Sequence, residues 1–140
     1  MARARILIVD DDAEIRCFCS IALQEKYEII EASSVDEAKS LLFSNPPQLI
    51  LLDLMMPGRD GLSLAEEMQQ DDELCKIPII IMTGTTKDSG LPPGFWKIGT
   101  PARGFLTKPF DHVKLLNEVE MVFTSVKKTD RITPGGGGYL

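Results

Sequence analysis

The stretch LLDLMMPGRDG, residues 51 to 61, carries the clearest indication of fold in the chain. Here the apolar run Leu49 to Leu52 ends in the carboxylate of Asp53, and the chain then turns through Pro57 and Gly58. A continuous apolar run is typical of a strand covered on both faces. In open α/β sheets, ligands bind outside the carboxyl ends of such strands. An acid at this position therefore indicates a functional site.

On both sides of this stretch, strand-like and helix-like segments alternate along the chain. The other strands are expected at residues 6–9, 27–32, 77–82 and 104–106. Apolar residues at helical spacing predict helices at residues 15–22, 35–42, 62–70 and 111–126. Candidate N-caps are Asp12, Ser34 (in an S-x-x-E capping box with Glu37) and Asp111. Five strands alternating with helices predict an α/β fold with a doubly wound five-stranded parallel sheet.

One segment interrupts this alternation. Residues 86–101 are rich in glycine and proline, which raise the free energy of a helix, so the fourth helix is expected to be short, distorted or replaced by loop. Phe95, Trp96 and Ile98 within it are expected either to fold onto the sheet or to form a contact patch. We expect one domain over residues 3–126 and a flexible tail or linker over residues 127–140.

Composition excludes several classes of protein. With 140 residues, 44% of them hydrophobic, the chain matches one globular domain. A net charge of −6 argues against nucleic acid and anionic membranes as partners, since phosphate groups bind basic surfaces. No apolar run approaches the length of a membrane span. Three cysteines without a C-x-x-C pair are expected to be free thiols, which predicts a cytoplasmic location.

Polar side chains collect at the ends of the predicted strands. Asp10 and Asp11 follow the first strand, Asp53 the third, Thr83 the fourth and Lys108 the fifth. Each has an ordinary alternative role, as a turn residue or a surface charge, but a parallel sheet brings all five together. Clustered carboxylates favour a hard cation such as Mg²⁺. A carboxylate can also attack phosphorus to give an aspartyl phosphate, with the lysine and the threonine pairing with phosphoryl oxygens.

Four motifs carry a family resemblance. ILIVDDD, LLDLMMPGRDG, IIIMTG and FLTKPF, each after a predicted strand, resemble the receiver domain of bacterial two-component response regulators over residues 3 to 126. The resemblance implies the flavodoxin-like receiver fold. It also implies Asp53 as phosphoacceptor, and Mg²⁺ held by Asp10, Asp11, Asp53 and the backbone carbonyl of Met55.

The resemblance also covers residues that bind the phosphoryl group or respond to it. It implies Thr83 as the switch hydroxyl, Lys108 as the phosphate-pairing cation and Phe105 as an aromatic switch residue. It also implies a cis bond between Lys108 and Pro109. Met55 and Thr85 match positions that set the rate of dephosphorylation in the family. The apolar Met55 side chain cannot orient an attacking water, which predicts a long-lived phosphoryl group.

The function implied is that of a phosphoacceptor, which catalyses only its own Mg²⁺-dependent phosphorylation and dephosphorylation and is otherwise no enzyme. Its partners would be a histidine kinase or phosphotransfer protein, and a downstream protein or a missing output domain; a homodimer is possible. One alternative is an interaction domain of the same fold with little phosphorylation-dependent switching. Another is an unrelated phosphatase or nucleotide-binding protein. A phosphatase with an aspartate nucleophile would need a second Asp at position 55, where the chain has Met55, and the sequence contains no phosphate-loop motif of a nucleotide-binding protein.

Overall fold

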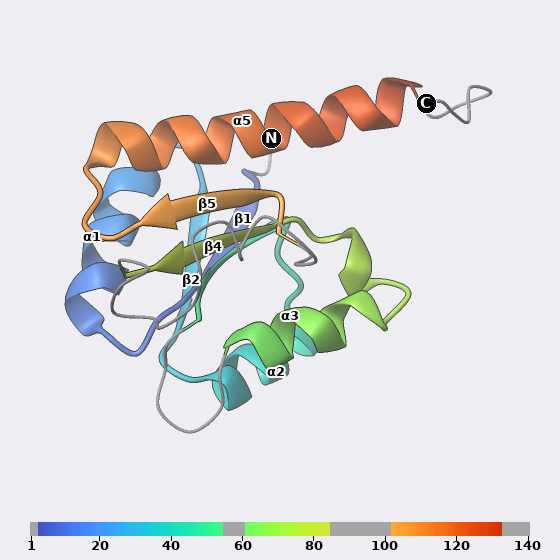
Figure 1. Ribbon diagram of the computed structural model, residues 1–140, viewed down its shortest axis with the longest axis horizontal. Coiled ribbons are helices and arrows are strands. Elements are labelled where there is room, and N and C mark those ends of the chain that lie inside the picture. Colours follow the sequence, from blue (N-terminus) through green and yellow to red (C-terminus); the bar gives the residue numbers. More distant parts are fainter. Residues whose placement is uncertain (1–2, 55–60, 85–101, 133–140) are drawn as a thin grey trace.

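The computed structural model describes residues 3–54, 61–84 and 102–132, with side chains as far as residue 125. Strands and helices alternate along this part of the chain (Figure 1). The elements are β1 (Arg5–Val9), α1 (Ala13–Leu23), β2 (Glu28–Ala32), α2 (Val35–Ser44), β3 (Leu49–Asp53), α3 (Gly61–Gln69), the 3₁₀ helix η1 (Leu74–Lys76), β4 (Ile79–Thr83), β5 (Gly104–Thr107) and α5 (His112–Ile132).

The five strands form one sheet in the order β2-β1-β3-β4-β5, and every neighbouring pair is parallel. This confirms the predicted doubly wound five-stranded parallel sheet. In the register of the sheet, Val9 lies beside Leu52, and Leu52 lies beside Ile81. The carboxyl ends of β1, β3 and β4 are therefore neighbours along one edge of the sheet, where the polar residues were expected to meet.

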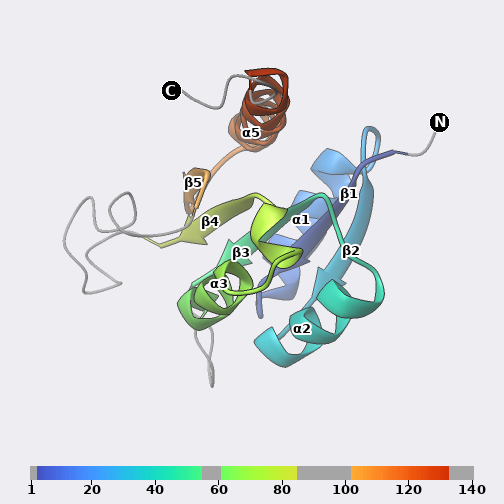
Figure 2. The same cartoon turned by 90° about the vertical axis from the view of Figure 1, so that its right-hand side faces the viewer.

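Helices cover both faces of the sheet (Figure 2). One face packs against α2 and α3 through a cluster that includes Leu42, Leu64 and Met68. The other face packs against α1 and α5 through a cluster that includes Leu23 and Leu115. All residues of the central strand β3 and of β4 are buried, which explains why both read as continuous rather than alternating apolar runs.

The predicted helix caps are present, with one variation. The Ser34 hydroxyl accepts a hydrogen bond from the Glu37 amide at 3.1 Å. The Glu37 carboxylate reaches back to the amide of Ser33 at 2.8 Å, one residue earlier than in an ordinary capping box. Such caps stabilise a helix by about 1 kcal/mol each. In the other two caps, Asp12 accepts from the amide of Glu14 and Asp111 from the amide of Lys114.

The start of the fourth strand was predicted two residues too early. The amide of Ile77 donates to the Leu74 carbonyl at 3.1 Å and closes the 3₁₀ turn η1, so Ile77 ends a turn instead of starting a strand. Pro78 follows and has no N–H to donate to a neighbouring strand. The ladder consequently begins at Ile79.

The last helix is longer than the sequence predicts, since α5 continues to Ile132. The division of the chain at residues 126 and 127 stays a prediction. The predicted irregular fourth helix, with Phe95, Trp96 and Ile98, lies outside the described residues. Within the described ranges, no helix combines the length and the apolar character needed to cross a membrane.

Candidate functional site

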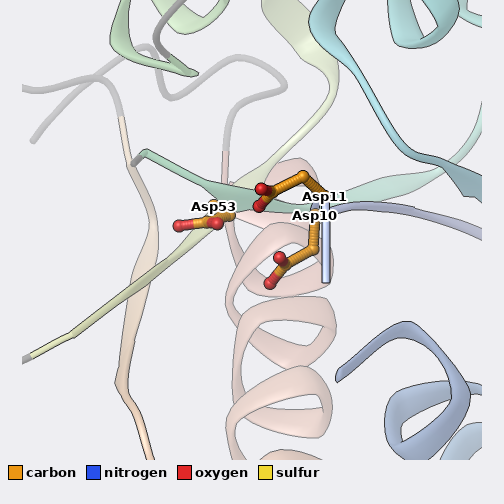
Figure 3. Close-up of side chains that lie close together, drawn as sticks. All are labelled: Asp10, Asp11 and Asp53. Carbon is orange, nitrogen blue, oxygen red and sulfur yellow. The ribbon is translucent and has the colours of Figure 1, made fainter. Parts of the chain in front are cut away.

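Three carboxylates gather at the carboxyl ends of two neighbouring strands (Figure 3). Asp10 and Asp11 directly follow β1, and Asp53 is the last residue of β3. Each offers one oxygen, and these oxygens lie within 4.8 Å of one another. Asp10 and Asp53 are buried while Asp11 is exposed, so the cluster is open to solvent on the Asp11 side.

Lys108, just beyond β5, supplies the positive charge of the site. Its Nζ lies 2.7 Å from Oδ2 of Asp10 and 3.5 Å from Oδ2 of Asp53. Burial acts to lower the pKa of Lys108, but the hydrogen bond to Asp10 and the charge of Asp53 outweigh it, so the pKa lies above its ordinary value. The side chain is therefore an ammonium at every physiological pH. The Lys108–Pro109 peptide bond is cis, as the resemblance implied.

Thr83 ends β4 with a buried hydroxyl, and among the described residues its Oγ1 has no hydrogen-bond partner. Its backbone carbonyl accepts a hydrogen bond from the Lys108 amide at 2.7 Å, which holds the two residues together. A buried hydroxyl left without a partner costs about 1–3 kcal/mol. The Thr83 hydroxyl is thus free to bind a ligand with acceptor atoms.

Two glycines border the site in different ways. Among the described residues, a Cβ on Gly84, next to Thr83, would meet no atom within 4 Å, so these residues leave space beside the threonine. A Cβ on Gly61, the first residue of α3, would collide with the Asp53 carbonyl oxygen. The Gly61 amide also donates to the Leu54 carbonyl at 3.2 Å. The absence of a side chain at Gly61 lets α3 begin directly against the backbone of the central acid.

Phe105 lies half-buried on the edge strand β5, and its amide faces away from β4. That amide donates to Oε2 of Glu118 on α5 at 3.1 Å. The neighbouring Gly104 makes this approach possible, because a Cβ there would lie 2.7 Å from the same oxygen. Glu118 therefore joins α5 to the strand that leads to Lys108.

The backbone of Asp10 is held by contacts that the motifs did not predict. Its amide donates to the Ala32 carbonyl at 3.1 Å, and its carbonyl accepts from Nη1 of Arg16 at 2.6 Å. Its Oδ1 accepts from the Asp12 amide at 2.9 Å. The sequence feature that could have indicated these contacts is Arg16, in the first turns of the helix that follows the acids. An arginine at such a place is usually a solvated surface charge.

The three cysteines are free thiols, as predicted. Cys19 lies buried on α1, close enough to the site to sense its charges. Burial, together with the negative charge of Asp10, raises the pKa of Cys19 to about 12. The thiolate is the form that ligates metals, so Cys19 remains a neutral packing residue at physiological pH.

The residues of the site fit a hard divalent cation next to an anion. Carboxylate oxygens are the donors that Mg²⁺ prefers, and three of them converge here. The unpartnered Thr83 hydroxyl and the Lys108 ammonium suit the oxygens of a phosphoryl group. Met55, expected to add a carbonyl ligand, and Thr85 lie outside the described residues.

A parallel sheet with acids, a threonine and a lysine at the carboxyl ends of its strands has the features expected of a receiver domain. The model of the response regulator receiver domain family matches residues 6–120, and the chain belongs to this family, whose members act in two-component systems. Aspartate phosphorylation and Mg²⁺ binding are general properties of that family.

Named relatives agree with this assignment. The chain is 34% identical over 135 residues to the phosphate regulon transcriptional regulatory protein PhoB of Pseudomonas aeruginosa, covering 96% of this chain and 58% of PhoB. It is 33% identical to the DNA-binding dual master transcriptional regulator RpaA of Synechocystis, covering 91% and 51%. The chain thus spans about half the length of these relatives. The signal receiver domain of a LuxO repressor protein from Vibrio parahaemolyticus superposes with a TM-score of 0.78 at 25% identity, covering 98% and 99%.

Proposed function

We propose that this domain accepts a phosphoryl group on Asp53 from a histidine kinase or a phosphotransfer protein and changes conformation to signal to a partner. The observation that carries the proposal is the surroundings of Asp53. Its carboxylate lies with Asp10 and Asp11 on one side, and with the Lys108 ammonium 3.5 Å from Oδ2. The hydroxyl of Thr83, which has no partner within the residues that the structure describes, supplies a further binding group for phosphoryl oxygens.

The transfer needs little more than positioning. An oxygen of Asp53 attacks phosphorus and forms a P–O bond. The bond from phosphorus to the donor's histidine nitrogen breaks, and the nitrogen keeps the electron pair and takes up a proton. Mg²⁺, when bound by Asp10, Asp11, Asp53 and the Met55 carbonyl, would offset charge on the phosphoryl oxygens. Lys108 pairs with one of these oxygens, and Thr83 donates a hydrogen bond to another.

The decisive test is incubation of the protein with a small phosphodonor and Mg²⁺, followed by intact-mass measurement. We expect a gain of one phosphate that is stable in acid and labile in base, as an acyl phosphate should be. Peptide mapping should place it on Asp53. A protein that takes up no phosphate under these conditions, while remaining folded, would favour the alternative of an interaction domain without phosphorylation-dependent switching.

Phosphoryl uptake should require a divalent cation, because the three acids repel an incoming anion without it. Asp11→Ala removes the solvent-facing oxygen ligand of the cluster, so we expect Mg²⁺ affinity to fall by more than the roughly 10- to 100-fold found when only a group that orients a ligand is removed, with a matching fall in uptake at limiting Mg²⁺. Asp12→Ala is the matched control, since Asp12 caps α1. It should lower stability by about 1 kcal/mol and leave Mg²⁺ affinity unchanged. The reverse order of the two defects would show that the cluster is misassigned.

We also propose that Thr83 and Phe105 form the switch. A phosphoryl group bound by Thr83 and Lys108 favours the conformer that brings these residues inward, and it shifts the equilibrium only by its differential affinity for the two conformers. Phe105 is linked to Lys108 through the short strand β5.

Thr83→Ala is expected to slow phosphoryl uptake, because one binding group for the phosphoryl oxygens is lost, and to remove the response of β5 even once the protein is fully phosphorylated. The measurement is the change in the amide and ring chemical shifts of Phe105 when the phosphodonor is added. Thr83→Ser, which keeps the hydroxyl, should retain that change. A full response of Phe105 in the alanine variant would disprove the coupling.

The remaining parts of the proposal concern the cell. We propose a cytoplasmic domain that contacts its kinase and either a downstream protein or an output domain joined to it, without nucleic acid or membrane contacts of its own. PhoB is a transcriptional regulatory protein of which this chain covers 58%, which supports a separate output unit. We also propose a homodimer, which sedimentation before and after phosphorylation can measure.

A further inference from the structure

We infer that Arg16 is a positioning residue for divalent-cation binding: it fixes the peptide group between the two acids Asp10 and Asp11. The inference rests on the proposed function, because the cation in question is the Mg²⁺ that supports phosphoryl uptake. It adds a residue that carries no ligand atom of its own.

The first step is the contact to Asp10. Nη1 of Arg16 donates to the carbonyl oxygen of Asp10 at 2.6 Å, the short distance expected of a charged donor. That carbonyl belongs to the peptide group that joins Asp10 to Asp11. Because a peptide group is planar, holding its oxygen also sets the direction in which Asp11 leaves β1. Asp11 is exposed and lies in the turn before α1, so its position depends on this backbone more than on packing.

The second step is that Arg16 is itself held. Its Nε lies 3.2 Å from Oε1 of Glu31 on β2, and Oε2 of Glu31 accepts from the Ser20 hydroxyl at 2.8 Å. Arg16 and Ser20 are four residues apart and therefore share one face of α1. The side chain of Arg16 is only 18% exposed. The guanidinium thus uses its fork of donors to join α1, the end of β2 and the end of β1.

Two explanations of the role of Arg16, as a positioning group or as a bare charge, predict opposite effects of its removal on Mg²⁺ binding. As a bare positive charge near a cation site, Arg16 would repel Mg²⁺, so its loss would strengthen Mg²⁺ binding. As a positioning group it lowers the conformational freedom of the acids, so its loss would weaken Mg²⁺ binding. The sign of the change therefore separates the two explanations.

The experiment measures the Mg²⁺ dissociation constant of Arg16→Met and Arg16→Lys by calorimetry and by the amide chemical shifts of residues 10–12. Arg5 provides a matched control: its Nε also lies 3.2 Å from a glutamate, Glu28, and its Nη1 donates to the Pro46 carbonyl at 3.1 Å, at the opposite end of β1. Arg5→Met therefore loses the same charge and the same kinds of bond away from the acids.

We expect both Arg16 variants to bind Mg²⁺ about tenfold more weakly than wild type, in the range found when groups that orient metal ligands are removed. Arg5→Met should bind as wild type does. At saturating Mg²⁺, phosphoryl uptake by Arg16→Met should return to the wild-type rate, because the reacting groups are untouched. Glu31→Gln removes the ion pair that holds Arg16 but keeps Arg16 itself, so it should lower Mg²⁺ affinity by a smaller factor. It replaces Arg16→Met if that variant does not fold.

Three results would overturn the inference. Unchanged or tighter Mg²⁺ binding by Arg16→Met would leave only the charge effect. A loss in Arg16→Met with no loss in Arg16→Lys would show that a single cationic donor to the Asp10 carbonyl is enough, and would refute the role given to the fork of donors. A wild-type protein that binds no Mg²⁺ would refute both the proposed function and this inference, whereas normal wild-type binding with unaffected variants would refute the inference alone.

Discussion

Asp53→Asn is expected to abolish phosphoryl uptake from a small phosphodonor in the presence of Mg²⁺. The side-chain amide is a poor nucleophile and carries no charge to bind the cation, so both requirements of the proposed transfer fail together. Intact mass should show no gain, where the wild-type protein gains one phosphate. Asp12→Asn is the control of identical chemistry, since asparagine caps a helix as well as aspartate does. It should be modified as fully as wild type.

Asp53→Asn should also raise the free energy of unfolding in the absence of Mg²⁺. Asp10, Asp11 and Asp53 repel one another, and removal of one charge relieves this, while Lys108 keeps its 2.7 Å contact to Asp10. A gain of about 1 kcal/mol corresponds to a rise of roughly 3–6 °C in the unfolding temperature of a domain of this size. Added Mg²⁺ should narrow the difference, since the cation relieves the same repulsion in wild type. Equal phosphorylation of Asp53→Asn, or a fall in its unfolding temperature without Mg²⁺, would contradict this account of the cluster.

Gly61→Ala is expected to lower the free energy of unfolding by about 2–3 kcal/mol, as overpacking at a fixed backbone does. The added Cβ would collide with the Asp53 carbonyl oxygen and crowd the Cα of Leu54. Backbone atoms cannot move aside as a flexible side chain can. Alanine is favoured over glycine by about 1 kcal/mol within a helix, so the steric cost must exceed that gain for the expected sign to appear. Denaturant unfolding curves measure the difference directly.

Two other glycines serve as controls for this prediction. Gly84→Ala places its Cβ where no atom of the described part of the chain lies within 4 Å, so stability should change by no more than about 0.5 kcal/mol. Gly104→Ala meets the end of the Glu118 side chain, which can move but then loses its bond to Phe105, so its cost should be intermediate. The expected order of destabilisation is Gly61, Gly104, Gly84. A larger loss at Gly84 than at Gly61 would disprove the steric explanation.

Most of the fold follows from the sequence because the buried strands are unambiguous. β3 and β4 are short, apolar up to their last residues, Asp53 and Thr83, and bounded by turn residues, and a parallel sheet requires helices between such strands. The polar residues after each strand then fall at one edge by geometry alone. Asp10, Asp53, Thr83 and Lys108 could be named for that reason, and the structure places them together.

The contacts that the sequence did not predict are those in which a side chain of one element reaches the backbone of another. The contacts from Arg16 to Asp10 and from Glu118 to Phe105 leave no periodic pattern, because each joins residues whose separation depends on packing. The late start of β4 was missed for a local reason, since the amide of Ile77 closes a 3₁₀ turn that apolar composition does not reveal. The end of α5 was placed too early because the tail lacks the apolar spacing on which the prediction relied.

The contact between Glu118 and Phe105 has a consequence for how the domain can meet other chains. β5 is an edge strand, and edge strands are where an extended peptide can add itself to a sheet by β-augmentation. Such a peptide would need the outward amide of Phe105 as a donor, and the carboxylate of Glu118 already holds it. A strand pairing at this position would have to displace the Glu118 carboxylate or leave one of its own acceptors unpaired. The outward amide of Phe105 is therefore unavailable for strand pairing as long as Glu118 holds it.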